Sequence, residues 1–465
     1  MQWQSRTRAL CGLICASIAA CSVGTPYRRP DIPLPQEWNA PAADVAAVWP
    51  AADWWRGFGS DRLDELIAQA QQSNDDLAGA IARVQEADAQ LRIAGAPLLP
   101  SVDLGATATR ERASEPGGGL GMFNVFNPVL TASYELDFWG KNRAARDAAR
   151  AAAVASRYDQ QTVALTVVSS VATTYFQALE LRDRLQVARD NLANGDKILR
   201  GLTFEQDVGT ATGLDVAQQA TVVALLYAAI PPLEEQFKQT VYALAVLIGR
   251  TPESIDVNDG TLTALKAPPV VSGLPSKLLA RRPDVAEAEQ QLIAANADIT
   301  VARAELFPTI ELTASGGYES SVLSSLVSPA NRIYALSAGL TQPIFHGGAL
   351  RGELAYSKAR YTELATTYHK TVLTALSNVE GALVAARQTA AQQERQADAV
   401  GKAKRAYEFA QVQMSAGTVN ILTVLNTENA LFSAQDTLVQ VQYSHLQALV
   451  DLFTALGGGW HEEHS

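Results

Sequence analysis

The chain has 465 residues, a formal net charge of −11 at pH 7, and a composition that is 48% hydrophobic but only 7% aromatic. This length allows two or three ordinary domains, and alanine-rich, aromatic-poor composition suits long packed helices better than a sandwich or an α/β enzyme. An acidic chain with no dense basic run is a poor match for nucleic acid, so no nucleic-acid partner is expected.

The first twenty residues have the pattern of an export signal. Two arginines precede an apolar run from Ala9 to Ala20, which is too short to span a membrane. The box IAAC, Ile18 to Cys21, resembles a bacterial lipobox. That resemblance implies a lipoprotein signal peptide at 1–20, covalent lipid on Cys21 and, because serine follows the cysteine, sorting to the outer membrane. Cleavage after Ala20 without lipidation is the alternative.

Two short stretches, LLPSVDL from Leu98 and LFPTIEL from Leu306, are nearly alike and lie 208 residues apart. A constant offset over so much sequence predicts an internal tandem repeat. We expect one copy at 61–250 and the other at 275–458, joined by a linker at 251–274, with a lipid-anchored segment at 21–60 and a tail at 459–465. Further pairs keep the same offset: Pro100 and Pro308, Gly140 and Gly348, Gly209-Thr210 and Gly417-Thr418, and Gly249 and Gly457.

Each copy is expected to begin with an amphipathic helix, at about 61–95 and 277–305. Pro100 and Pro308 then end the approach to the next element, because proline does not continue a helix. Alternating apolar and polar residues follow, as in VLTASYELDF from Val129, and this period of two predicts a β-hairpin in each copy, at about 101–138 and 309–344.

After each hairpin the sequence predicts very long helices with coiled-coil-like seams. Gly140 to Val208 as one helix is on the order of 100 Å long at 1.5 Å per residue. Turns at 208–213 and 415–420 then reverse the chain into returning helices. Pro231-Pro232 is expected to interrupt the first returning helix.

Each alternating run has about the ten residues that cross a bilayer at a tilt, and the alternation fits a barrel with lipid outside and water inside. Four strands do not close a barrel, and an open edge in lipid leaves backbone groups unpaired. Spanning strands therefore require several chains in a ring, although the residues do not select two, three or four. The alternative is a lipid-anchored coiled-coil scaffold whose hairpins rest on the membrane surface without spanning it.

Four stretches carry a family resemblance: WWRGFGSDRLDELIAQA (Trp54 to Ala70), the segment LLARRPDV to TIELTAS (Leu278 to Ser315), QPIFHGGALRGEL (Gln342 to Leu354) and ALGGGW (Ala455 to Trp460). With the lipobox, they resemble the outer membrane factors, the TolC-like channels of Gram-negative efflux systems, in their lipoprotein branch. The resemblance implies a mixed α/β membrane protein. Four β-strands per chain would contribute to a trimeric 12-stranded barrel, above a long periplasmic α-helical barrel.

The same resemblance implies a passive exit duct of a tripartite efflux pump that conducts drugs or other small toxic compounds across the cell outer membrane. Its implied partners are a periplasmic adaptor protein and an inner-membrane transporter of the resistance-nodulation-division type. The adaptor would contact the turns at Gly209-Thr210 and Gly417-Thr418. A duct for type I protein secretion shares this fold and stays an alternative.

The candidate periplasmic entrance departs from the family pattern. Val419 and Asn420 stand where relatives often place Arg or Asp, and Thr423 and Asn426 stand where they often place aspartates. Asp215, which the offset pairs with Thr423, is our candidate for the missing negative charge, because a ring of carboxylates attracts cations. A solvated aspartate at a helix end is the alternative.

Neither an enzyme nor a metal centre is expected. The sequence has no G-x-S-x-G motif, no P-loop and no G-x-G-x-x-G before a helix. None of its five histidines has a cysteine partner or forms HExxH, and the HEEH of His461 to His464 fits an acidic tail. No catalytic residue, no metal ligand and no cofactor beyond the lipid on Cys21 are predicted.

Overall fold

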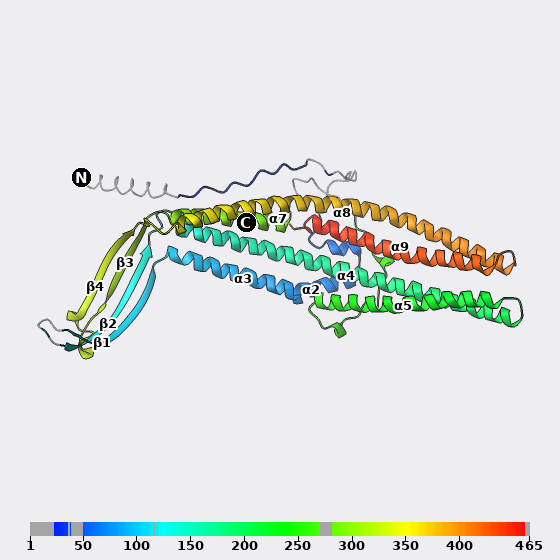
Figure 1. Ribbon diagram of the computed structural model, residues 1–465, viewed down its shortest axis with the longest axis horizontal. Coiled ribbons are helices and arrows are strands. Elements are labelled where there is room, and N and C mark those ends of the chain that lie inside the picture. The colour runs from blue at the N-terminus through cyan, green and yellow to red at the C-terminus, as the bar shows by residue number, and fades with distance from the viewer. Residues whose placement is uncertain are drawn as a thin grey trace. The chain divides into compact units, whose positions relative to one another are not determined.

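A computed structural model describes residues 23–35, 38, 50–114, 118, 120–269 and 281–460 (Figure 1). The expected signal peptide, Cys21 and parts of the expected linker and tail lie outside the described residues. The chain divides into two compact units. We call them the sheet unit (residues 1–32, 82–157 and 287–370) and the turn unit (residues 33–81, 158–286 and 371–465).

The described elements repeat with the predicted offset, which confirms the internal repeat. The long helices α4 and α8 each have 67 residues, and the returning helices α5 and α9 each have 35. In chain order the helices and strands are α2 (Asp61–Ser73), α3 (Asp75–Gly95), β1 (Ser101–Ser114), β2 (Leu120–Glu135), α4 (Lys141–Asp207), α5 (Gly213–Leu247), α7 (Pro283–Ala304), β3 (Thr309–Tyr318), β4 (Arg332–Thr341), α8 (Ala349–Ser415) and α9 (Ile421–Ala455).

The expected single helix over 61–95 is wrong, because Asn74 divides it into α2 and α3. The backbone of Asn74 is extended, at φ −73° and ψ 128°. Its side-chain Oδ1 accepts a hydrogen bond from the N–H of Leu77 at 3.0 Å, and its Nδ2 donates to the carbonyl of Leu247 at 2.8 Å. Asn74 therefore caps the start of α3 and ties it to the end of α5.

The expected interruption at Pro231-Pro232 is also wrong, because α5 continues through both prolines. Each proline lacks the N–H that would bond to the preceding turn. Both prolines are exposed, and so are Tyr227 and Ala228, the residues one turn earlier whose carbonyls lose this donor. Leu233, Val241 and Leu244 of the same helix are buried, and this packing holds the helix together.

In the sheet unit, β1 to β4 form one antiparallel sheet in chain order (Figure 1). In the first hairpin, β2 begins at Leu120, nine residues before the alternating run that was predicted to start at Val129. Leu136 and Phe138, which were expected in this strand, follow its end. There Asp137 turns away to cap α4, accepting the N–H of Asn142 and of Arg143 at 2.9 Å each. In the second hairpin, β4 ends at Thr341, so residues 342–344 are not part of the strand.

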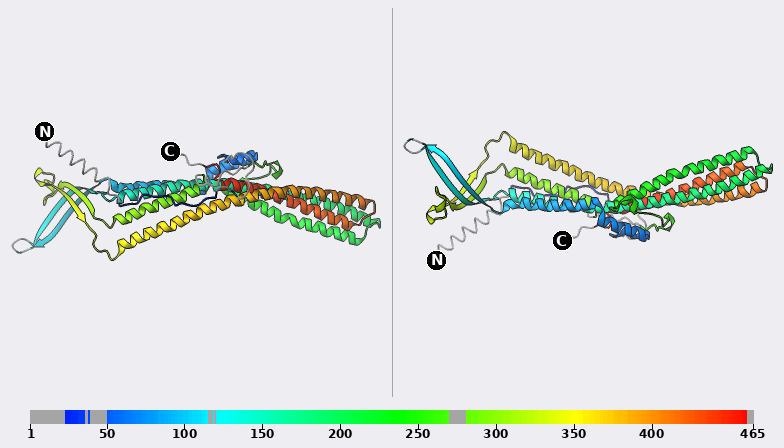
Figure 2. Two further views of the ribbon diagram at one scale, coloured as in Figure 1. Left: turned by 90° about the horizontal axis from the view of Figure 1, so that it is seen from above. Right: turned by 90° about the horizontal axis from the view of Figure 1, so that it is seen from below.

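The turn unit is a helical bundle with an aromatic centre. The later part of α4, with α5, the later part of α8, and α9, run side by side in both views of Figure 2. Trp54 stacks on Phe453 with ring centroids 5.0 Å apart, and Phe58 meets Phe176 edge-on at 4.9 Å. These rings lie in a buried cluster with Leu63, Leu66, Ile67 and Tyr175, so the Trp54 region packs onto the helices.

Two glycines close the two repeats in the same way. Gly249 follows α5 at φ 66°, and Gly457 follows α9 at φ 89°. A Cβ on Gly249 would lie 2.0 Å from the carbonyl oxygen of Ser73, and a Cβ on Gly457 would lie 1.8 Å from that of Arg281. Each site therefore requires glycine for its backbone angle and for the close approach of another segment.

By length and composition, α4 and α5 each contain a window apolar enough to cross a membrane, with 44% and 6% of that window buried, respectively. Core helices of soluble proteins meet the same criterion.

Candidate functional site

The four strands present one apolar face. Every pairing in the sheet joins two odd-numbered or two even-numbered residues, so all even-numbered strand residues share one face. Tyr334, Leu336 and Leu104 on that face are 85%, 78% and 76% exposed in the single chain. The central apolar residues of this even face are Val102, Leu104, Ala106, Ala108, Leu130, Ala132, Tyr134, Ile310, Leu312, Ala314, Tyr334, Leu336, Ala338 and Leu340.

The odd face is the more polar of the two and carries the acids. It has small hydroxyl side chains on all four strands and four carboxylates, Asp103, Glu111, Glu135 and Glu311, but no Lys or Arg within the described strands. Its large apolar residues are Phe123, Val125, Val129 and Ile333. Glu135 lies opposite Glu311 in the register, and Lys141 neutralises part of this charge through its Nζ, 2.7 Å from the Glu135 carboxylate. Alternation in the run from Val129 assigns Glu135 to the polar side of its strand, whereas a shared face for all four acids follows only from the register of the strand pairings.

Pro100 and Pro308 each stand directly before the first strand of a hairpin. The carbonyl of Pro308 accepts a hydrogen bond from Trp139 Nε1 at 2.7 Å. The Trp139 ring also lies against Phe307, with centroids 4.8 Å apart. In the sheet unit this indole therefore joins the end of the first hairpin to the start of the second.

The two helix turns have the same hydrogen bonds. Gly209 and Gly417 adopt left-handed backbones at φ 81° and 71°. The next residue in each turn, Thr210 or Thr418, donates both its N–H and its hydroxyl to the carbonyl five residues earlier, at 2.8–3.0 Å. All four residues are exposed. This is the Schellman-type helix end that glycine favours, and it leaves both turns accessible.

At the candidate entrance, Asp215 belongs to a capping box. Its carboxylate accepts the backbone N–H and the hydroxyl of Thr212 at 2.8 and 2.7 Å, and its own N–H donates to that hydroxyl. These bonds lower the pKa of Asp215, so its charge persists to lower pH than usual.

In the second repeat Asn420 takes the equivalent capping position. Its Oδ1 accepts the N–H and the hydroxyl of Thr423 at 3.3 and 3.2 Å. Asn426 is exposed, whereas Val419 is half-buried. The second turn is thus neutral, and Asp215 is the acid that the described structure places in the first turn of a returning helix.

The turn unit contains a buried polar cluster that was not predicted from the sequence. Glu428 of α9 is fully buried, and burial raises the pKa of its carboxyl to about 7. Asn194 Nδ2 donates to Glu428 Oε1 at 2.9 Å and to the Tyr407 hydroxyl at 2.6 Å. The second oxygen, Oε2, has no hydrogen-bond partner among the described residues. The sequence does contain one sign of this cluster, because Glu428 is an acidic residue within an apolar helix seam that includes Val424 and Leu431.

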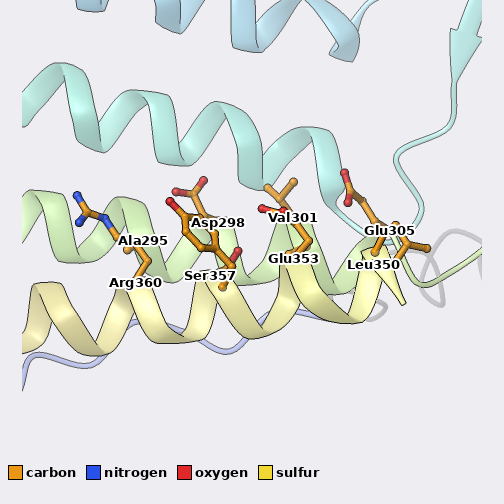
Figure 3. A pocket seen from close by; sticks show the side chains of 11 residues that line it. Ala295, Asp298, Val301, Glu305, Leu350, Glu353, Ser357 and Arg360 are labelled. Atoms are coloured by element: carbon orange, nitrogen blue, oxygen red, sulfur yellow. The ribbon is translucent and has the colours of Figure 1, made fainter. Parts of the chain in front are cut away.

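In the sheet unit, α7 and α8 border an open cleft of about 490 Å³ (Figure 3). It is lined by Asp298 of α7, by Glu305 just after α7, and by Glu353 and Arg360 of α8. Burial raises the pKa of the Asp298 carboxyl. Arg360 is also paired with Glu363 at 2.7 Å. Over the described part of the chain, no three His, Cys, Asp or Glu side chains gather to hold a metal ion.

The segment that follows the candidate lipidation site is held along α7. The carbonyls of Val23 and Thr25 accept hydrogen bonds from Arg303 at 2.6 Å and Asn296 at 3.1 Å. Farther along, the Arg29 guanidinium forms a two-bond ion pair with Glu289. Because Arg303 lies in the last turn of α7, this strap keeps residue 23 near the segment that enters β3.

Comparison with known proteins agrees with this geometry. The family model described as "Outer membrane efflux protein" matches residues 66–250 and 274–458. The chain is 40% identical to the pyoverdine export outer membrane protein OpmQ of Pseudomonas putida, over 98% of each chain. It is 39% identical to OpmQ of Pseudomonas aeruginosa, over 97% of this chain and 96% of that protein.

Among solved structures, the CmeC outer membrane channel of Campylobacter jejuni superposes with a TM-score of 0.87 at 25% identity, covering 96% of each chain. The resemblance to outer membrane factors is therefore confirmed, and with it an outer-membrane efflux channel that is not an enzyme. The chain belongs to the family of outer membrane efflux proteins.

Proposed function

We propose that three copies of the chain form the exit duct of a tripartite efflux pump. In this assembly the four strands of each copy join into one 12-stranded barrel, and the helices continue as a conduit in the periplasm. Energy comes from an inner-membrane transporter of the resistance-nodulation-division type, and a periplasmic adaptor links that transporter to the duct.

The sorting of side chains between the two sheet faces carries this proposal. The even face is apolar over its central rows, as lipid contact requires, and the odd face is hydroxyl-rich and acidic, as a water-filled lumen requires. The sheet also ends in two unpaired edges, β1 and β4. Unpaired backbone groups cost several kcal/mol each in lipid, so these edges favour closure against further copies.

The helices support association as well. Large apolar side chains remain exposed on α5, including Leu225, Tyr227 and Val246, at 66–67% of their surface, and Phe409 on α8 is equally exposed. Such exposure is unusual for a monomer and fits contact with neighbouring subunits. The two exposed turns, at Gly209-Thr210 and Gly417-Thr418, are the proposed adaptor contacts.

We further propose that Cys21 carries the lipid that anchors the chain. The strap from Val23 to Arg29 supports this, because it runs along α7 toward the β3 end. Lipid on Cys21 would then be two residues from a segment fixed beside the barrel.

The transported compounds are proposed to be small molecules. Two relatives at about 40% identity are named for pyoverdine export, whereas relatives named for toluene or antibiotic efflux are 32% identical. Pyoverdine is thus a second candidate substrate beside drugs and solvents. Deleting the gene and measuring pyoverdine in the periplasm and in the medium separates the two, since pyoverdine would be retained in the periplasm only if this duct exports it.

The test of the duct itself is conductance in a planar bilayer, with the oligomer mass of the detergent-extracted protein measured in parallel. Discrete conductance steps from a trimer are expected. A monomer that never conducts, even after deletion of residues 415–420, would favour the non-spanning scaffold. A type I secretion duct would conduct too, and would be revealed by an exported protein that is lost from the medium on deletion.

A further inference from the structure

The charged residues of the sheet are sorted completely between its faces. All four strand carboxylates have odd numbers, and the three strand arginines, Arg110, Arg112 and Arg332, have even numbers. The arginines therefore share the apolar face, where the proposed barrel meets lipid. The sequence R-E-R at 110–112 shows the sorting within a single strand, because Glu111 points to the opposite face.

The three arginines lie at one end of the apolar face. Arg110 is two residues beyond Ala108 in β1, whereas Arg332 opposes Tyr318 in the row that continues through Pro128 to Ala106. By this register Arg110 lies about 14 Å farther along the strand direction than Arg332. Both positions are at the hairpin-loop end of the sheet, away from the helices that enter β1 and leave β4. Aromatic side chains on the same face mark this boundary: Phe126, Tyr318 and Tyr334.

These side chains are available for a ligand. All three arginines are exposed, and none forms an ion pair or side-chain hydrogen bond with a described residue. No acid of the described strands shares their face. Arg110 and Arg112 lie on edge strand β1, and Arg332 lies on edge strand β4, so in the proposed barrel both groups stand on the strands that border a neighbouring subunit.

We propose that this arginine cluster binds the phosphate groups of the phosphorylated glycolipid, lipid A, in the outer leaflet of the outer membrane. The inference rests on the proposed spanning barrel, which places the hairpin loops outside the cell. Guanidinium groups pair with phosphate oxygens through two parallel hydrogen bonds, and the apolar rows below would contact the acyl chains. Three such sites per trimer would each use arginines of two subunits.

The test is native mass spectrometry of the detergent-extracted full-length trimer with added lipid A, dephosphorylated lipid A or phosphatidylglycerol. The wild-type protein is expected to retain phosphorylated lipid A about tenfold better than the dephosphorylated form. This comparison needs no variant. Equal retention of the two forms, or equal retention of phosphatidylglycerol, would overturn the proposal.

A triple variant, R110A/R112A/R332A, is expected to lose this preference, whereas R110K/R112K/R332K should keep most of it because the charges remain. The matched control R92A/R351A/R395A removes three exposed helix arginines and should bind like the wild type. A preference that survives the alanine triple, or that disappears in the control, would refute the site. Channel conductance of each preparation separates this failure from failure of the duct, because a conducting trimer without lipid preference contradicts only the lipid site.

Discussion

Replacing Leu336 with arginine tests whether the even face contacts lipid. Leu336 is 78% exposed in the single chain and lies in the central row Leu336–Ala314–Ala132–Val102 of the sheet. Arginine on the lipid face of a barrel costs about 2–4 kcal/mol at the bilayer midplane, hence about 6–12 kcal/mol for three copies. That is comparable with the whole stability of a typical domain, so Leu336→Arg is expected to abolish trimer assembly in the membrane.

Ala335 provides the matched control. It is the preceding residue of the same strand, but it faces the polar side, in a row with Asp103. Ala335→Arg should therefore assemble and instead reduce cation conductance. The assay is the yield of trimer in the outer-membrane fraction, by sedimentation after detergent extraction. Assembly of Leu336→Arg at the wild-type yield would refute the assignment of the even face to lipid.

Four further perturbations test the remaining features. Asp103→Asn combined with Glu111→Gln should shift the reversal potential in a KCl gradient toward zero, because the odd face would lose half of its strand carboxylates. An unchanged reversal potential would mean that the odd face does not line the conduit. If Asp215 lines the entrance, Asp215→Asn should likewise lower cation selectivity. The wild-type selectivity should persist into mildly acidic solution, because the hydrogen bonds from Thr212 lower the pKa of the Asp215 carboxyl. Unchanged selectivity in Asp215→Asn would mean that the residue acts only as a helix cap. Burial raises the pKa of Glu428 from 4.5 to about 7, so the wild-type protein should lose stability as the pH rises from about 4.5 to about 7, with no further loss above that. In thermal unfolding, Glu428→Gln should reduce this pH dependence by up to about 3 kcal/mol per subunit. A variant with the same pH profile as the wild type would contradict the assignment. A left-handed backbone costs a non-glycine residue about 1–2 kcal/mol. In a denaturation experiment, Gly457→Ala should destabilise the turn unit by more than this, because the new Cβ would also clash with the Arg281 carbonyl. The control is Gly401→Ala on α8, where a Cβ meets no other atom, and it should be neutral or stabilising.

The repeat and the hairpins could be predicted because their signals are local. Alternation in TIELTASGGY predicted residues 309–318, which are the bounds of β3. The 208-residue offset predicted equivalent turns, and the structure shows the same hydrogen bonds at Thr210 and Thr418. Both signals depend on the order of residues in the chain and need no knowledge of distant contacts.

The errors arose where a distant contact or solvent exposure decides the outcome. Asn74 ends α2 because its side chain both caps α3 and reaches the carbonyl of Leu247, a residue 173 positions away. Pro231 and Pro232 remain helical because they face solvent while the next residue, Leu233, is buried. Neither circumstance can be read from the neighbouring sequence.

The candidate site was predictable in part. The exposed turns and the asymmetry between Asp215 and Thr423 were visible in the sequence. The charge sorting of the sheet was not noticed, because it depends on the register of three strand pairings at once. Glu428 was missed for a similar reason, since its partners Asn194 and Tyr407 come from α4 and α8.

The shared parity of all three strand pairings constrains how this sequence can evolve. Inserting or deleting a single residue within any strand would move every following residue of that strand to the opposite face, exchanging alanines and leucines for threonines and glutamates. Length changes inside the strands are therefore viable only in steps of two, whereas the segment between Tyr318 and Arg332 is restrained chiefly where Ser320 bridges to Phe126 and Glu319 bonds to Asn331. Among descendants of this chain, loops should drift in length while strand lengths keep their parity.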